Sequence, residues 1–387
     1  MKNILIIPSN YITNIESRFL YKIKNVAKQF IKADYKEFME GIGAHLLCAE
    51  NYHYDGFAEI NEVNAFILGE YYPEYTMEEI PKFSNYPSMH NCKLKKNMSI
   101  NDVLGDIKIF DCIIFGSRSG NYIKKILDLA KKKNIPRILL DHFDDTQIYS
   151  SKNINFNLSK RFKYKEDFDL MFKHDLPTNC DLDYVYPICP MPIRADNYYK
   201  ITNKEELSKN IDISFSGRVG HNNATDREYF QEILKEYKNS KFVNIALKAK
   251  SYKAVDKNKV SSLKSYLDMI ASSKIALSPF GKVWDSTRHS ELAIYNCLPI
   301  IPQPNCKLSD GIEVNDENSI NYEINFDEKI GKSKIINQDI IKDKISYFLK
   351  HDKQRNKISK NWSDMINKHN SFKSRAKFIL DKSKAYF

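Results

Sequence analysis

The sequence predicts an α/β protein with two Rossmann-like domains. Its 387 residues exceed the roughly 250–300 residues at which single cores stop growing. Apolar residues make up 42% and aromatic residues 12%, which is enough for real cores and too much for disorder. The chain also repeats a pattern in which an apolar strand is followed by a loop, a helix and another strand. We therefore expect domains at 1–195 and 196–365, followed by a terminal helix at 366–387.

The first half begins with a strand at Ile4–Ile7, whose apolar run is too short for a signal peptide. Apolar residues at three- and four-residue intervals between Ile15 and Ile31 then predict a helix. Residues 44–100 contain many tyrosines and prolines, so we expect an irregular region that faces an acceptor.

A complete strand–helix–strand unit follows. It comprises a strand at Cys112–Phe115, a helix at Asn121–Lys133 and a strand at Arg137–Leu140. The intervening Gly116–Gly120 is interpreted as a tight turn, because it lacks the Gly-Lys-Ser/Thr ending of a phosphate-binding loop. Asp141 follows the second strand, and in an open parallel sheet this position faces a cleft.

Prolines in Val185–Pro192 favour extended backbone and predict a linker between the halves. The second half opens with a strand at Ile211–Phe215 that leads into Gly217 and Arg218. A helix is expected at Glu228–Tyr237. A strand at Phe242–Leu247 follows it, and a short helix is expected at Val260–Ile270.

The most informative stretch is 276–301. A buried strand ending at Leu277 is followed by a loop, Ser278–Gly281, and then by Asp285 or Ser286, either of which can cap a helix. That helix carries Arg288 and Glu291 on one face and ends near Asn296, before a strand at Pro299–Ile301. Through their side-chain chemistry, Arg288 can meet a diphosphate and Glu291 can accept hydrogen bonds from ribose hydroxyls.

This stretch resembles the donor-binding segment of GT-B glycosyltransferases of the group-1 type. It is more similar still to the exostosin-like variant, whose loop carries an Asp-Ser-x-Arg-x-x-Glu pattern that stands here as Asp285–Glu291. Asn296-Cys297 occupies the place of the usual glycine-cysteine, a departure that concerns helix termination. The strand ending in Gly217-Arg218 resembles the turn with which the same family opens its second domain.

The resemblance implies a GT-B architecture, with two Rossmann-like domains facing a central cleft and a terminal helix that often crosses back to the first domain. It implies transfer of a sugar from a nucleotide sugar to a glycan or lipid-linked glycan, as in surface polysaccharide or lipopolysaccharide assembly. No metal or other cofactor is required, because a helix dipole and basic residues neutralise the leaving diphosphate. The donor-binding residues implied are Gly217, Arg218, Lys248, Ser278, Phe280, Gly281, Asp285, Ser286, Arg288 and Glu291.

The catalytic residues expected are Asp141, Asp144 and Arg288. An inverting transfer needs a carboxylate or imidazole beside the acceptor hydroxyl, whereas a retaining transfer needs no fixed base of that kind. The first two residues are predicted at the cleft edge of the first domain, and the arginine is predicted beside the diphosphate. Further candidates for the base, each with a structural alternative, are His53, Asp55, His142, Asp145 and His289.

Positive charge is concentrated at the end of the chain, where 341–387 carries thirteen Lys/Arg and four Asp/Glu of a chain whose net charge is +11. No nucleic-acid-binding module accompanies these residues, so we expect no nucleic-acid partner. Ser371–Tyr386 has the pattern of a basic amphipathic helix. Its apolar stripe can pack on the first domain or attach loosely to an anionic membrane, and a solvated basic face is the third interpretation.

The seven scattered cysteines contain no Cys-x-x-Cys pair, which argues against disulfides or a zinc site and for a cytoplasmic protein. Peripheral contact with the inner face of a membrane would depend on the basic helix. Asp181 and Asp183 form an Asp-x-Asp pair that in a metal-dependent GT-A transferase would hold the ion. The sequence is also compatible with a sugar-nucleotide epimerase on the GT-B scaffold and with a non-enzymatic basic binding protein. Chelator sensitivity, activity without an acceptor, and steep salt dependence of binding distinguish these three functions.

Overall fold

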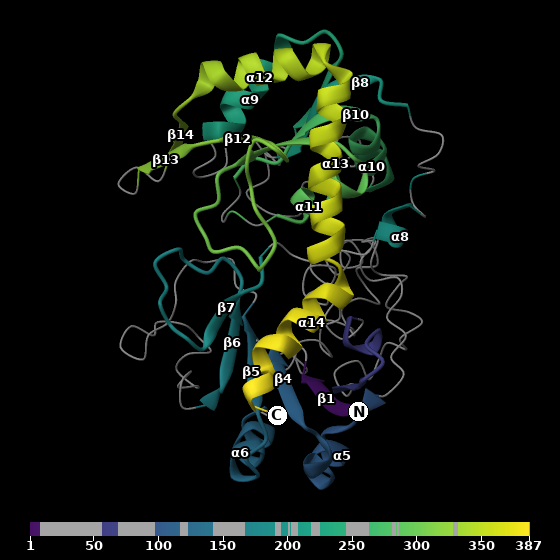
Figure 1. Ribbon diagram of the computed structural model, residues 1–387, viewed down its shortest axis with the longest axis vertical. Helices are drawn as coiled ribbons and strands as arrows, with labels where there is room; N and C mark the ends of the chain where they lie inside the picture. The colour runs from purple at the N-terminus through teal and green to yellow at the C-terminus, as the bar shows by residue number, and fades with distance from the viewer. Residues whose placement is uncertain are drawn as a thin grey trace, which may run out of the picture. The chain divides into compact units, whose positions relative to one another are not determined.

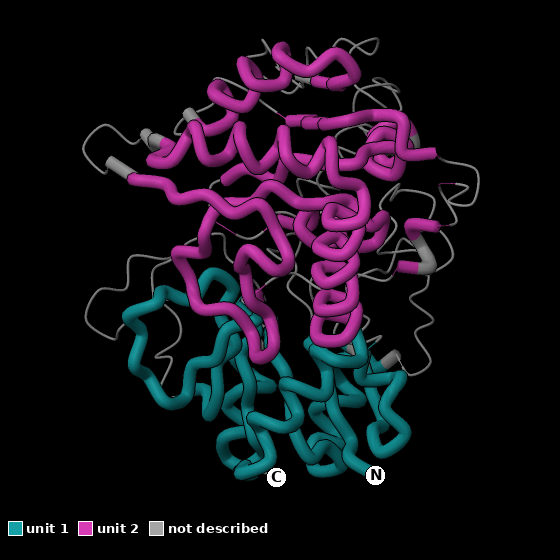
Figure 2. The backbone as a smooth tube through the Cα atoms, turned by 45° about the horizontal axis from the view of Figure 1, so that its top comes forward, with its two compact units in different colours: residues 1–143, 147–188, 372–387 teal, residues 144–146, 189–371 magenta. Residues whose placement is uncertain are grey.

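The computed structural model describes residues 1–7, 56–68, 97–116, 123–141, 167–189, 195–199, 202, 208–217, 225–244, 263–280, 284, 286–327 and 332–386. The chain divides into two compact units (Figure 2). Unit 1 contains residues 1–143, 147–188 and 372–387, and unit 2 contains residues 144–146 and 189–371. The chain therefore leaves unit 1, builds unit 2, and returns to unit 1 with its last residues.

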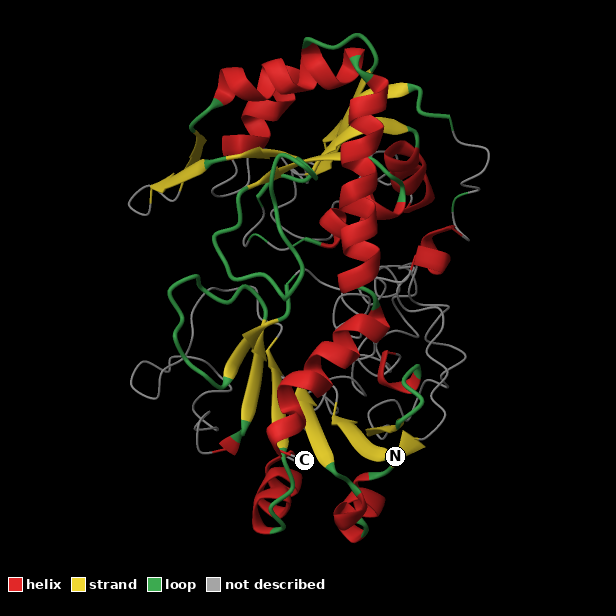
Figure 3. Ribbon diagram, viewed as in Figure 1, coloured by secondary structure: helices red, strands yellow, loops and turns green. Residues whose placement is uncertain are grey.

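Unit 1 is built on a parallel sheet of seven described strands in the order β3-β2-β1-β4-β5-β6-β7 (Figures 1 and 3). From β1 the strands follow in chain order on each side: β2 and β3 on one side, and β4 to β7 on the other. This is the strand order of a Rossmann-type sheet. The strands are β1 (Lys2–Ile7), β2 (Val63–Leu68), β3 (Asn97–Met98), β4 (Cys112–Gly116), β5 (Arg137–Asp141), β6 (Leu170–Lys173) and β7 (Val185–Pro187).

Both faces of this sheet are covered, which explains why its central strands are continuous apolar runs rather than alternating ones. On one face, Leu5 and Ile113 pack with residues of α5 (Ile100–Gly105) and α6 (Ile123–Lys132). On the other face, Ile4 and Ile114 pack with Ala376 and Ile379 of α14 (Phe372–Ser383). Short 3-10 turns are also described in this unit at Ile107–Ile109 and Lys384–Tyr386.

Unit 2 has a parallel sheet of five described strands in the order β12-β11-β10-β8-β9. Numbered along the chain within this unit and taken from β9, the order is 2-1-3-4-5, the flavodoxin-like doubly wound arrangement. The strands are β8 (Ile211–Gly217), β9 (Ser240–Asn244), β10 (Ser273–Leu277), β11 (Leu298–Pro302) and β12 (Ile320–Tyr322), and β13 (Ile324–Asp327) pairs with β14 (Lys332–Ile335) in a separate antiparallel ribbon.

Helices cover both faces of this second sheet (Figure 1). Residues of α9 (Thr225–Lys235) and α12 (Gln338–Lys350) share one core with the strands. Residues of α10 (Leu263–Ala271), α11 (Thr287–Ile294) and the short α8 (Ala195–Tyr199) form a core with Ala276 of β10. The long α13 (Asp352–His369) packs on α11 and β11 through Trp362 and Ile366, and the Trp362 indole donates to the His289 carbonyl oxygen at 2.9 Å.

The α/β class and the two Rossmann-like sheets are confirmed, and most predicted elements of the second half are found within three residues of their expected bounds. One expectation was wrong and another needs refinement. The region 44–100 was expected to be irregular, yet it supplies β2 and β3. The expected linker Val185–Pro192 does contain the passage from unit 1 to unit 2, which lies between Ile188 and Cys189. Its first residues belong to β7, because Val185 pairs with Met171 and is buried in the unit 1 core.

The terminal helix forms as expected, and its apolar stripe is used within the protein. Ala376 and Ile379 are buried in the core of unit 1, whereas Lys377 is exposed. Arg375, one of the basic residues of this helix, is 1% exposed. Within the described ranges, no helix combines the length and apolar character needed to cross a membrane. The helix expected between Ile15 and Ile31 lies outside the described residues.

Candidate functional site

The strand order of unit 2 changes direction between β8 and β10, which are neighbours in the sheet although β9 lies between them in sequence. In open α/β sheets, ligands bind beyond the carboxyl ends of the strands at such a switch point. The register pairs Ile275 with Ile213 and Ala276 with Ser214, so Ser216 and Ser278 lie level at this edge. The loop that was predicted from the sequence, which starts at Ser278, therefore begins at the sheet edge where ligands bind in folds of this topology.

Gly217 ends β8 and allows a close packing arrangement there. A Cβ at this position would lie 2.6 Å from the Phe215 ring, so any larger residue would displace that ring. The Arg288 guanidinium lies over the same ring, 5.4 Å from its centroid, and over the Tyr266 ring at 5.7 Å. Two aromatic faces therefore support the arginine by cation–π attraction, and Gly217 leaves room for one of them.

The helix α11 begins at this edge with a side-chain cap. Ser286 has extended backbone, and its Oγ accepts a hydrogen bond from the Arg288 backbone N–H at 3.3 Å. The expectation that Asp285 or Ser286 caps the helix is therefore met by the serine. The positive end of the helix dipole and the arginine together make this an environment that favours an anion.

Glu291 lies one turn further along α11 and is 1% exposed. The Tyr266 hydroxyl donates to its Oε2 at 2.6 Å, and the Arg288 Nε donates to the Tyr266 hydroxyl oxygen at 3.1 Å. Burial raises the pKa of Glu291, while the Tyr266 hydrogen bond and the Arg288 charge act in the opposite direction. A carboxylate, a phenol and a guanidinium from two helices thus form one hydrogen-bonded chain.

Two buried serine hydroxyls at this edge of unit 2 have no hydrogen-bond partner among the described residues. They are Ser216 Oγ and Ser278 Oγ. Buried polar side-chain atoms are nearly always hydrogen-bonded, so each exception needs an explanation. A hydroxyl-bearing ligand at the switch point would supply one.

The loop that follows β10 is held by the start of α9. Asp226 is fully buried, and its Oδ2 accepts from the Phe280 backbone N–H at 2.9 Å and from the Tyr322 hydroxyl at 3.0 Å. Arg227 Nε donates to the Phe280 carbonyl oxygen at 3.1 Å. Both backbone groups of Phe280 are therefore fixed, which orients the loop next to Ser278.

Sequence reasoning missed the roles of Asp226, Tyr266 and Tyr322. The only signal for the first is an aspartate in the first turn of a helix, where it is common. The two tyrosines contact residues 25 and 96 positions away, so no local pattern marks them. His289 was a candidate for the site, but it is fully buried, packs against the Trp284 ring at a tilt of 33° and bonds through Nε2 to the Trp284 carbonyl oxygen at 2.9 Å. This buried environment favours a structural role for His289 over a role as the catalytic base.

In unit 1, Asp141 ends β5 at the carboxyl edge of the sheet, as expected. It is fully buried, and its Oδ2 lies 3.3 Å from Nζ of Lys173, also fully buried, which is its register partner on β6. This pairing favours a structural role for Asp141, and the catalytic role of Asp141 stays a prediction.

Several predicted site residues lie outside the described residues: Asp144, Arg218, Lys248, Gly281 and Asp285, and also His53, Asp55, His142 and Asp145.

Asp181 and Asp183, the residues of the alternative metal site, are both exposed in the turn before β7. This position favours a solvated turn. Five cysteines fall in the described ranges, and all five are buried and outside any disulfide: Cys112, Cys180, Cys189, Cys297 and Cys306.

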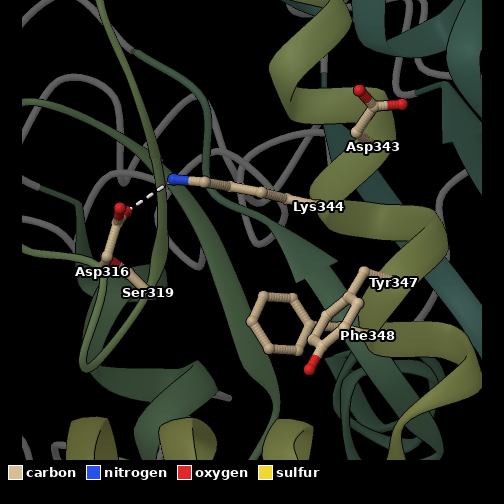
Figure 4. Close-up of a pocket in the computed structure, with 6 residues that line it drawn as sticks. All are labelled: Asp316, Ser319, Asp343, Lys344, Tyr347 and Phe348. Atoms are coloured by element: carbon tan, nitrogen blue, oxygen red, sulfur yellow. Dashed lines mark hydrogen bonds and ion pairs between the residues drawn. The ribbon is translucent and has the colours of Figure 1, made fainter.

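A hollow of about 350 Å³ in unit 2 lies between α12 and the chain around Asp316 (Figure 4). It is lined by Asp316, Ser319, Asp343, Lys344, Tyr347 and Phe348. The Lys344 ammonium reaches Asp316 Oδ1 at 2.6 Å, and Asp343 adds a second carboxylate. None of the predicted donor-binding residues lines this hollow, and two carboxylates beside one ammonium disfavour a diphosphate. The switch-point edge is the better candidate site.

No known protein family and no curated protein matches the sequence. Solved structures do resemble the chain. HepE from Anabaena, in complex with UDP and glucose, is 10% identical, with 100% of both chains covered and a TM-score of 0.40. The UDP-GlcNAc 2-epimerase from Neisseria meningitidis, bound to UDP-GlcNAc, is 9% identical, with 100% of both chains covered and a TM-score of 0.43. An α1,3-fucosyltransferase is 12% identical, with 99% of this chain and 90% of that chain covered and a TM-score of 0.41.

Proposed function

We propose that the chain is a glycosyltransferase that moves a sugar from a nucleotide-sugar donor to a glycan or lipid-linked glycan acceptor. The observation that carries the proposal is the switch-point edge of unit 2, where a capped helix N-terminus presents Arg288 and the buried Glu291. The same edge carries Ser216 and Ser278, whose hydroxyls have no partner in the part of the chain that is described. This combination offers positive potential for a diphosphate and a carboxylate for a ribose. These are the two chemically distinct parts of a nucleotide-sugar donor.

In the proposed reaction, Arg288 and the start of α11 stabilise the negative charge that grows on the departing diphosphate. The aromatic rings that support the guanidinium keep it in place before the charge develops, so little reorganisation is needed. Asp226 and Arg227 hold the Phe280 backbone, which fixes the loop along the donor. Glu291 accepts a hydrogen bond from the ribose. Charge neutralisation by these groups is proposed to make a metal unnecessary.

The acceptor and the cellular setting follow from the same proposal. We place the enzyme in the cytoplasm, in surface polysaccharide or lipopolysaccharide assembly, with peripheral contact to an anionic membrane where a lipid-linked acceptor would lie. What supports membrane contact is the exposed basic side of α14 and the turn after it, which includes Lys373, Lys377 and Lys384. No nucleic-acid partner is proposed.

The test is thermal unfolding of the full chain with UDP, GDP, ADP, CMP and TDP, each with and without EDTA. A ligand present at 100 times its dissociation constant adds about 2.7 kcal/mol of stability, which shifts a melting curve measurably. We expect one selective, EDTA-insensitive nucleotide, and loss of its effect together with donor turnover in Arg288→Ala and Glu291→Ala. UDP, which the Anabaena HepE structure contains, is the first to test.

Lys241→Ala provides the matched control, because Lys241 is an exposed cation of the same unit on β9. It should bind the nucleotide as the unmodified chain does. Unchanged donor turnover in both site variants would overturn the proposal. A hit that disappears with EDTA would favour the metal-dependent transferase, and turnover of the nucleotide sugar without any acceptor would favour an epimerase.

A further inference from the structure

The exposed apolar side chains of unit 2 are concentrated on one helix. In the described part of this unit, the large hydrophobic residues that are exposed are Ile336, Ile340 and Tyr347, with exposed fractions of 60%, 52% and 45%. The first immediately precedes the N-cap of α12, and the other two lie on α12 itself. Together with Asp343 and Lys344 they form the outer face of α12. Single exposed hydrophobic residues need no explanation, whereas a group of them with a charged rim marks an interaction surface.

The helix does not use these side chains to pack on its own sheet. Ile341 and Ile345, on the opposite side of α12, are fully buried in the core that the helix shares with the strands. Ile340 and Tyr347 are two turns apart, so they point to the same side of the helix, about 10 Å from each other. A surface helix normally carries polar residues on that side, so a second apolar stripe requires a partner.

Charges beside this stripe are separated along the helix. The exposed Asp339 and Asp343 lie toward its start, whereas Lys344, which is partly exposed, and the exposed Lys350 lie toward its end. This order suits the helix dipole, but the dipole does not account for the apolar side chains. A second copy of the same helix, packed antiparallel, accounts for both features, because it sets the acidic half of one helix against the basic half of the other.

Two-fold pairing also matches individual positions. In a symmetric dimer, each contact between two residues occurs twice, once in each direction. With the axis midway between Asp343 and Lys344, Ile340 faces Tyr347 of the second copy, and Asp343 faces Lys344 of the second copy. The Lys344 ammonium already bonds Asp316 at 2.6 Å, and its three donors allow it to bond a second carboxylate as well.

The hollow of about 350 Å³ described above adjoins this face. Tyr347 and Phe348 line it, and their rings meet edge-on with centroids 5.2 Å apart (Figure 4). In the antiparallel pair, Ile340 of the second copy lies opposite Tyr347, so an aliphatic side chain meets an apolar wall. A parallel pair would instead set carboxylate against carboxylate and ammonium against ammonium.

We infer that the outer face of α12 is the interface of a symmetric homodimer, in which the α12 helices of two copies of this chain pack antiparallel. None of the predicted donor-binding residues lies on α12, so the inference is independent of the proposed function. Two helices of 13 residues, each about 20 Å long, cover less than the roughly 800 Å² per partner of a standard interface. The dimer is therefore expected to dissociate reversibly, with a dissociation constant in the micromolar range.

The test is sedimentation velocity of the full chain at concentrations across the micromolar range. We expect the average mass to rise from that of one chain toward that of two. Ile340→Asp puts a carboxylate against the Tyr347 ring of the second copy and should weaken association by at least about 10-fold. Ile109→Asp is the matched control, because Ile109 is 43% exposed in unit 1, and it should associate as the unmodified chain does. Both variants replace exposed side chains, so their melting temperatures should stay close to that of the unmodified chain.

Charge reversal tests the antiparallel arrangement itself. Asp343→Lys sets lysine against lysine across the axis, and Lys344→Asp sets aspartate against aspartate, so each variant alone should associate more weakly than the unmodified chain. A mixture of the two variants should form a dimer with one copy of each, because every such contact then joins unlike charges.

A chain that stays monomeric over the whole range, or whose association is unchanged by Ile340→Asp, would overturn the inference. If Ile340→Asp left the average mass unchanged and reduced binding to anionic vesicles, the outer face of α12 would be a membrane-facing surface, and the homodimer would again be overturned. Each of these results leaves the proposed donor site intact, since nucleotide binding is measured separately.

Discussion

Glu291 links ligand recognition to folding stability at the scale of a single residue. Burial raises its pKa in the folded protein, so between the ordinary glutamate pKa and the raised value the folded state holds a proton that the unfolded state has lost. The free energy of unfolding therefore decreases as pH rises through that window. Glu291→Gln removes the titration and should flatten the dependence, which urea unfolding at a series of pH values would measure.

The control for this prediction is Glu232→Gln, because Glu232 is an exposed residue of α9 paired with Lys235. Its stability curve should follow the unmodified chain. If Glu291→Gln kept the original slope across the window, burial of an ionisable Glu291 would be contradicted. The same variant should bind ribonucleotides weakly, since the amide replaces one carboxylate oxygen with a donor.

Single residues also show what a sequence pattern can and cannot reveal. Asn296 takes the place of a glycine in the pattern that the 276–301 stretch resembles, and its φ of 49° lies in the left-handed region that asparagine tolerates. The departure therefore preserves helix termination, and a local pattern was sufficient to predict this. The placement of Arg288 and Glu291 on one face of the helix could also be predicted from their spacing in the sequence. Tyr266 was not assigned a role, because its contact arises only when α10 packs beside α11.

At the scale of elements, the link between α9 and the loop after β10 yields a prediction. Asp226→Ala removes the acceptor for the Phe280 N–H and the Tyr322 hydroxyl, and each buried donor left unsatisfied costs about 1–3 kcal/mol. We expect lower stability and, beyond that, weaker nucleotide binding because the loop loses its anchor. Urea unfolding with and without the selected nucleotide measures both effects.

Asp226→Asn is the matched variant, since an amide retains one acceptor oxygen and removes the charge. It should lose less stability than Asp226→Ala and retain part of the nucleotide effect. Equal nucleotide binding by Asp226→Ala and the unmodified chain would show that the Phe280 loop does not depend on this anchor.

Elements that the sequence predicted well share a physical property: their strands and helices are contiguous in the chain. The unit from β10 to β11 comprises a strand, a capped helix and a second strand, and it contains its own cap, loop and termination signals. The strands β2 and β6 were missed because their place is set by partners far away. Val63 pairs with Lys2, and Leu170 pairs with Ile138. A polar Asn64 also interrupts the apolar run of β2, and its side chain bonds to Asn3 of the neighbouring strand.

At the scale of the whole molecule, the path of the chain makes the last residues part of unit 1. A Cβ at Gly56 would overlap the backbone oxygen of Phe372, so the end of the chain and residue 56 approach without room for a side chain. Nine of the eleven net positive charges belong to 341–387, yet the apolar side of α14 is already buried. Membrane attachment by insertion of that side would therefore compete with folding, whereas attachment through exposed lysines would not.

Ile379→Ala tests whether the apolar side of the terminal helix belongs to the core. Ile379 is 1% exposed and packs with Ile4, Ile114 and other strand residues, so its truncation should lower the free energy of unfolding by about 2–5 kcal/mol. Lys377→Ala, two positions away and exposed, should change it by no more than about 0.5 kcal/mol. Binding to anionic vesicles should show the opposite ranking, because an exposed cation contributes to the surface attraction and a buried isoleucine does not. If Ile379→Ala instead left stability unchanged and reduced vesicle binding, the apolar side of α14 would be a membrane-facing surface, and unit 1 would have to be stable without it.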